Sequence, residues 1–136
     1  MAEPSFILVP GAGGMAWYWH RIVPLLEQAG CEAIAVDLPA DDSSKGLRDY
    51  ADIIVAAIGT RSNGVLVAQS LAGFTAPLVR APHALRGLIL VNAMIPQAGR
   101  NPRGLVGQYG RRGRANRGGQ GRRVHPPVRH SDVLSA

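Results

Sequence analysis

The sequence predicts an α/β protein in which a parallel sheet carries helices on both faces. Two observations support this fold class. Over residues 1–99, apolar runs of strand length alternate with stretches of helical spacing, as in a sheet built from right-handed crossovers. The runs are also continuously apolar, which is typical of parallel strands buried on both faces. A chain of 136 residues has room for one modest domain.

The order of elements begins with the run SFILV at 5–9, which predicts the first strand. The glycine-rich turn PGAGG follows it. Residues 16–30 have helical spacing and end at Gly30, a favourable C-terminal stop, while Pro24 indicates a helix that starts late or bends. The same alternation then continues, and we expect a strand at 32–38, a helix at 47–59, a strand at 64–69, a helix at 71–82 and a strand at 85–93.

The charge of the chain is divided unevenly between two segments. Residues 1–99 hold six basic and eight acidic side chains, a balance of −2, whereas residues 100–136 hold nine arginines and only Asp132, a balance of +8. Together they give the net charge of +6. We therefore expect a folded unit over 1–99 and a disordered Arg/Gly-rich tail over 100–136.

The tail has two interpretations. Its arginines could bind RNA or another polyanion weakly and without sequence preference, in a salt-sensitive way. Alternatively, the segment is the product of a shifted reading frame, because GC-rich DNA translated out of frame is rich in arginine, glycine and proline. The second interpretation fits the abrupt change of composition near Gly99 better, and we expect the shifted frame to remain open beyond that point.

Several classes of protein are disfavoured by the composition. Cys31 is the only cysteine, so neither an intrachain disulfide nor a cysteine metal cluster is expected. We expect no metal and no cofactor, since the glycine-rich turn lacks the G-x-G-x-x-G pattern of dinucleotide sites. The apolar runs are too short to span a membrane, and the N-terminus is not that of a signal peptide. We therefore expect a cytoplasmic location.

The stretch GVLVAQSLAGF at 64–74 places Ser70 at a corner between a strand and a helix. Ala68, Ala72 and Gly73 supply the small residues that so tight a corner requires. This pattern is a relaxed form of the nucleophile elbow, in which a strained serine projects its hydroxyl over the sheet edge. A serine that caps a helix after a strand is the alternative interpretation of the same residues.

The stretches FILVPGAGG, AVDLPADD, VLVAQSLAGF and GLILVNAMIP resemble, in this order, the α/β-hydrolase superfamily and its small esterase and hydroxynitrile-lyase-like branch. The resemblance covers about residues 5–99 and implies Ser70 as the nucleophile. It also implies an oxyanion hole formed by the backbone N–H groups of Ala12 and Leu71. Pro10 stands where the family has a histidine before the glycine of the oxyanion loop.

The resemblance further implies a sheet order of second, first, third and fourth strand. It also implies a fold that is truncated here, since the family continues with outer strands and a late helix. We therefore expect the fourth strand to form an exposed edge, which invites aggregation or swapped pairing.

A serine nucleophile needs a base and a group that orients the base, and the family carries both after further strands. Four histidines are available. His20 is expected to face the surface or the cap, His83 enters the fourth strand at the wrong end of the sheet, and His125 and His130 lie in the tail. Asp37 ends the second strand at the correct edge but fits an ordinary turn there.

The resemblance thus implies an esterase-type serine hydrolase that acts on a small ester or related acyl compound. Because acid and base positions are unmatched, we expect this 136-residue chain to be inactive. The alternative is a non-enzymatic fragment whose basic tail binds polyanions. The sequence leaves the substrate and the oligomeric state open.

Overall fold

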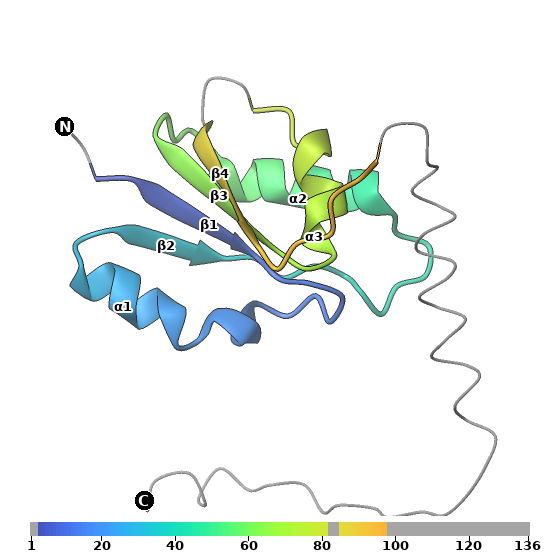
Figure 1. Ribbon diagram of the computed structural model, residues 1–136, viewed down its shortest axis with the longest axis horizontal. Coiled ribbons are helices and arrows are strands. Elements are labelled where there is room, and N and C mark those ends of the chain that lie inside the picture. Colours follow the sequence, from blue (N-terminus) through green and yellow to red (C-terminus); the bar gives the residue numbers. More distant parts are fainter. Residues whose placement is uncertain (1–2, 82–84, 98–136) are drawn as a thin grey trace, which may run out of the picture. The chain divides into compact units, whose positions relative to one another are not determined.

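The computed structural model describes residues 3–81 and 85–97 (Figure 1). Four strands form one parallel sheet in the order β2-β1-β3-β4. This is the order that the resemblance implied. The strands are β1 at Ser5–Val9, β2 at Glu32–Ala35, β3 at Gly64–Gln69 and β4 at Leu85–Val91.

Helices cover both faces of the sheet (Figure 1). On one face, α2 at Leu47–Ile58 and α3 at Ala72–Thr75 pack on β1 and β3. That core comprises Ile7, Val9, Val36, Leu38, Ile54, Ile58, Leu66, Ala68, Ala72 and Ala76. The other face carries the 3-10 helix η1 at Ala16–Trp19 and helix α1 at Ile22–Gln28, with a smaller core of Leu8, Trp19 and Val67.

The predicted helix at 16–30 is two elements rather than one. The 3-10 helix η1 ends at Trp19, and α1 begins at Ile22. Pro24 explains the late start of α1. Proline has no backbone N–H, which costs nothing in the first turn of a helix but removes a hydrogen bond further along. Gly30 follows α1 with a φ of 83°, a backbone conformation that glycine adopts readily, so the predicted stop is confirmed.

Three other elements are shorter than predicted, and the strand expected at 85–93 ends at Val91. Helix 71–82 is reduced to α3 and a 3-10 turn, η2, at Ala76–Leu78. Pro77 accounts for this, since it has no N–H to continue α-helical hydrogen bonding. Strand 32–38 ends at Ala35, after which the Leu38 N–H turns to the Gly14 carbonyl at 2.7 Å.

Among the described strands, β4 lies at one edge of the sheet, and its apolar residues are exposed, as the family resemblance implied. Leu88, Ile89, Leu90 and Val91 are 40–48% exposed. None of the helices in the described ranges is long and apolar enough to cross a bilayer. The predictions for residues 100–136 lie outside the described residues.

Candidate functional site

Ser70 sits at the corner between β3 and α3, and its backbone is strained. Its φ is 51°, in the left-handed region that side chains other than glycine rarely adopt. Hydrogen bonds to nearby backbone of the same chain hold Ser70 in this conformation. The Ser70 N–H donates to the Val91 carbonyl at 3.1 Å, and the Ser70 carbonyl accepts from the N–H groups of Gly73 at 3.1 Å and Met94 at 2.9 Å. Such strain persists only where surrounding contacts over-determine it.

Small residues make this corner possible. Ala68 and Ala72 are buried at 0% and 3% exposure. A side chain at Gly73 would collide with the Met94 carbonyl oxygen. The predicted need for small residues is therefore met, and Gly73 leaves space for the segment that follows β4.

The glycine-rich loop after β1 passes directly beside the serine. A Cβ placed on Gly11 would lie 3.0 Å from the Ser70 Cβ and 3.5 Å from its Oγ. The loop is closed by a hydrogen bond from the Gly14 N–H to the Gly11 carbonyl at 3.1 Å. Gly14 has a φ of 69°, and a side chain there would strike the Leu38 carbonyl. Glycine at these places therefore brings the loop backbone within reach of the Ser70 hydroxyl.

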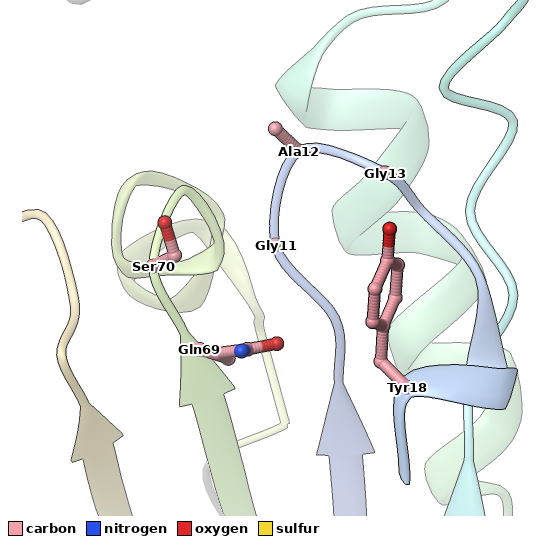
Figure 2. Close-up of a pocket in the computed structure, with 6 residues that line it drawn as sticks. All are labelled: Gly11, Ala12, Gly13, Tyr18, Gln69 and Ser70. Atoms are coloured by element: carbon pink, nitrogen blue, oxygen red, sulfur yellow. The ribbon is translucent and has the colours of Figure 1, made fainter. Parts of the chain in front are cut away.

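An open cavity of about 180 Å³ lies between the loop and the corner, lined by Gly11, Ala12, Gly13, Tyr18, Gln69 and Ser70. Figure 2 shows the Ser70 hydroxyl pointing beyond the end of β3, with the Gly11–Gly13 backbone next to it. The Gln69 side chain extends toward the loop, and the Tyr18 ring stands on the loop's other side. Small-molecule sites usually measure roughly 300–1,000 Å³, so the described residues enclose only part of a typical ligand.

The backbone around the cavity offers hydrogen-bond donors. Within the described part of the chain, the N–H groups of Ala12 and Leu71 have no hydrogen-bond acceptor, and the Ser70 Oγ has no hydrogen-bond partner. Ala12 lines the cavity, whereas Leu71 begins the α3 turn behind the serine and is not among the lining residues. A serine hydroxyl beside free amide donors is an arrangement that can bind a carbonyl oxygen.

Two of the side chains considered as partners of Ser70, His20 and Asp37, have other roles in the structure. The His20 Nδ1 donates to the Trp17 carbonyl at 2.8 Å, and the ring stacks on Trp17 with centroids 4.3 Å apart. Asp37 accepts the Ala16 N–H at 2.7 Å, at the start of η1. Neither residue lines the cavity. His83, His125 and His130 lie outside the described residues, and no group of three metal-ligating side chains occurs within them.

The consecutive aromatic residues Trp17, Tyr18 and Trp19 have different surroundings. Trp19 is a buried anchor, Tyr18 lines the cavity, and Trp17 is 64% exposed. Sequence reasoning assigned no role to Gln69, a lining residue, or to Asn92, which directly follows β4 and has a φ of 47°. The tolerance of asparagine for left-handed backbone was the available signal for Asn92.

Fold and site together define a class of protein. A parallel sheet ordered 2-1-3-4, a strained serine after its third strand and a glycine loop after its first strand are the features of an α/β-hydrolase core.

Comparison with known proteins agrees. The model of the alpha/beta hydrolase family matches residues 6–135, and the chain belongs to this family.

Individual relatives are similar over part of their length. Norfluorocurarine synthase 1 of Strychnos nux-vomica is 32% identical over 108 residues, which are 71% of this chain and 41% of that protein. The probable esterase PIR7A of Oryza sativa subsp. indica is 32% identical with the same coverage. The crystal structure of polyneuridine aldehyde esterase superposes with a TM-score of 0.65 at 26% identity, covering 81% of this chain and 48% of that chain. The chain thus spans less than half the length of these relatives.

Proposed function

We propose that Ser70 is the nucleophile of an esterase-type serine hydrolase that acts on small esters. The observation that supports this proposal is the left-handed backbone of Ser70. Hydrogen bonds to Val91 and Met94 hold this conformation, and the serine faces the glycine-rich loop. A helix N-cap serine needs no such strain, because cap residues normally have extended backbone. The names of two relatives, the probable esterase PIR7A and polyneuridine aldehyde esterase, support an ester as the substrate class.

The chemistry would begin with attack of the Ser70 Oγ on the ester carbonyl carbon, while a base takes the hydroxyl proton. The Ala12 and Leu71 N–H groups would stabilise the oxyanion of the tetrahedral intermediate. Collapse of that intermediate releases the alcohol, which takes the proton, and leaves an acyl-serine for water to hydrolyse. The cavity lining among the described residues includes no histidine or carboxylate that could act as the base.

Because of that lining, we predict ester hydrolysis by the 136-residue chain at or near background. Labelling of Ser70 by a fluorophosphonate probe should be slow or absent. In well-studied serine proteases, loss of triad members still leaves roughly 10³–10⁴-fold catalysis over water, but that remainder requires a well-formed oxyanion hole. Rapid turnover that depends on Ser70 would contradict this prediction.

A chimera tests the nucleophile directly. Residues 98–136 would be replaced by the C-terminal part of the rice probable esterase PIR7A, chosen to supply the acid and histidine that the family resemblance implies. The chimera should react with the probe, and Ser70→Ala should abolish the reaction. Ser62→Ala, at an exposed serine away from the cavity, is the matched control. A folded chimera that stays unlabelled, or that labels equally well with Ser70→Ala, would refute the assignment.

A second candidate function rests on the charge of residues 100–136, with nine arginines and one aspartate. We propose that this segment binds RNA or heparin weakly at low salt. Removing it should abolish retention on a heparin column. Equal retention of the shortened chain would exclude this function. The cytoplasmic location expected from the sequence remains a prediction.

A further inference from the structure

Asn92 shares an unusual backbone conformation with Ser70. Among the described residues other than glycine, only these two have a positive φ, 51° at Ser70 and 47° at Asn92. Ser70 directly follows β3 and Asn92 directly follows β4, and the last residues of those strands, Gln69 and Val91, are register partners. The two left-handed residues therefore lie at the same edge of the sheet, at the carboxyl ends of neighbouring parallel strands.

The side chain of Asn92 does not account for its conformation. Asn92 is exposed, and its side chain makes no hydrogen bond within the described part of the chain. Asparagine tolerates left-handed backbone better than most residues, but tolerance does not impose it. Because left-handed residues other than glycine persist where surrounding contacts hold them, the cause lies in the backbone on either side of Asn92.

The backbone on the two sides of Asn92 binds the same residue. The Val91 carbonyl accepts the Ser70 N–H at 3.1 Å, and the Met94 N–H donates to the Ser70 carbonyl at 2.9 Å. In a regular parallel ladder, the two groups that bond one residue come from positions two apart. Val91 and Met94 are three apart, so one extra residue lies between the two contacts. The left-handed turn at Asn92 takes up this extra residue, as in a β-bulge whose first residue is left-handed.

The place of Met94 depends on this turn. The Met94 peptide lies against Gly73, where an added Cβ would collide with the Met94 carbonyl oxygen. If residue 92 were extended or right-handed, the chain would carry Met94 away from this position. The Ser70 carbonyl would then keep only the N–H of Gly73, at 3.1 Å, as a donor.

We propose that Asn92 is a positioning residue for Ser70. Its left-handed turn brings the Met94 N–H onto the Ser70 carbonyl and so holds the serine in its own left-handed conformation. Asn92 does not line the cavity, so it acts through Met94 and Ser70 and not on a substrate. Its value for catalysis rests on the proposed function, whereas the coupling between the two backbones does not require Ser70 to react.

The test is NMR spectroscopy of the isotope-labelled full chain. A strong NOE between the amide and α protons of Ser70 marks its positive φ, and amide exchange reports the Met94 hydrogen bond. Asn92→Val should weaken this NOE and speed exchange at Met94 by about tenfold or more, because a β-branched residue resists left-handed backbone. Asn92→Gly should retain both signals, since glycine adopts a positive φ without strain.

Two more variants keep the test decisive. Ala93→Val is the matched control at the next residue, whose φ is not positive, and it should leave the Ser70 NOE unchanged. Asn92→Ala replaces Asn92→Val if the valine variant does not fold, because alanine also disfavours left-handed backbone. An unchanged Ser70 NOE in the variant used, its loss in Asn92→Gly, or an equal loss in Ala93→Val would overturn the proposal. An unreactive chimera would refute the nucleophile and leave this result as it stands.

Discussion

The two ends of the sheet are built in opposite ways. At the carboxyl end, Ser70 and Asn92 adopt left-handed backbone, and a cavity opens beside the serine. At the amino end, a closed network of hydrogen bonds joins β1, β2 and α2 through Ser5, Glu32 and Arg61. Backbone strain is therefore found at the end of the sheet that holds the candidate site. At the other end, the polar side chains of the network are all hydrogen-bonded.

The network at the amino end centres on one carboxylate. Glu32 accepts from Arg61 Nε at 2.7 Å, from Arg61 Nη2 at 2.5 Å and from the Ser5 hydroxyl at 2.7 Å. Arg61 Nη1 also donates to the Ala57 and Ile58 carbonyls at the end of α2. The Arg61 guanidinium first, and the Ser5 hydroxyl second, lower the pKa of Glu32 from 4.5 to about 2. A cation at a helix C-terminus is favourable as well.

The largest effect is expected at the carboxyl end, from Gly73→Val. The new side chain would meet the Met94 carbonyl, which is backbone and cannot move freely. We expect a loss of about 3 kcal/mol in the free energy of unfolding. Gly87→Val is the control, because a Cβ at Gly87 meets nothing within 4 Å. Urea denaturation of both variants checks this, and equal losses would mean that the close approach at Gly73 is unimportant.

A smaller effect of opposite sign is expected from Ser70→Gly. Glycine adopts a φ of 51° without strain, and relief of left-handed strain of roughly 1–3 kcal/mol is partly offset by the flexibility of glycine in the unfolded chain. The free energy of unfolding should rise by about 1 kcal/mol. Ser62→Gly, at an exposed serine whose φ is not positive, should lower it slightly. A lower free energy of unfolding for Ser70→Gly would mean that the left-handed backbone at Ser70 stores no strain.

The smallest effect is expected at the amino end, from Glu32→Gln, because Glu32 is exposed to solvent. The pKa of Glu32 is lower in the folded state, so its ionised form stabilises the fold above pH 4.5, and this contribution disappears as the pH falls toward 2. The melting temperatures of wild type and Glu32→Gln should therefore differ at pH 6 and converge near pH 2. Asp52→Asn, on α2 without an ion pair among the described residues, is the control. A difference that grows on acidification would contradict the prediction.

The comparison also separates what the sequence could predict from what it could not. The strand at 64–69, the helix stop at Gly30 and the strained corner at Ser70 follow from local rules of apolar runs, left-handed glycine and tight turns. The late start of α1 at Ile22 also follows from the sequence, because Pro24 indicated it. The short α3 was not expected, since apolar periodicity continues past Pro77 although the α-helix does not.

The hydrogen bonds that hold the Ser70 backbone could not be predicted from the sequence. They require the carbonyl of Val91 and the N–H of Met94, residues about twenty positions away whose side chains carry no signal. The roles of Ala12 and Leu71 remain predictions for the same reason, because backbone donors leave no trace in residue type.

The two tryptophans of the chain stand two positions apart and in unlike surroundings. Trp19 is 7% exposed, and its indole N–H is buried without an acceptor among the described residues, whereas Trp17 is 64% exposed and stacked on His20. The intrinsic fluorescence of the molecule therefore has two separable sources. Acrylamide should quench Trp17 far more than Trp19, so the emission of a Trp17→Phe variant would report on the α1 face of the sheet alone.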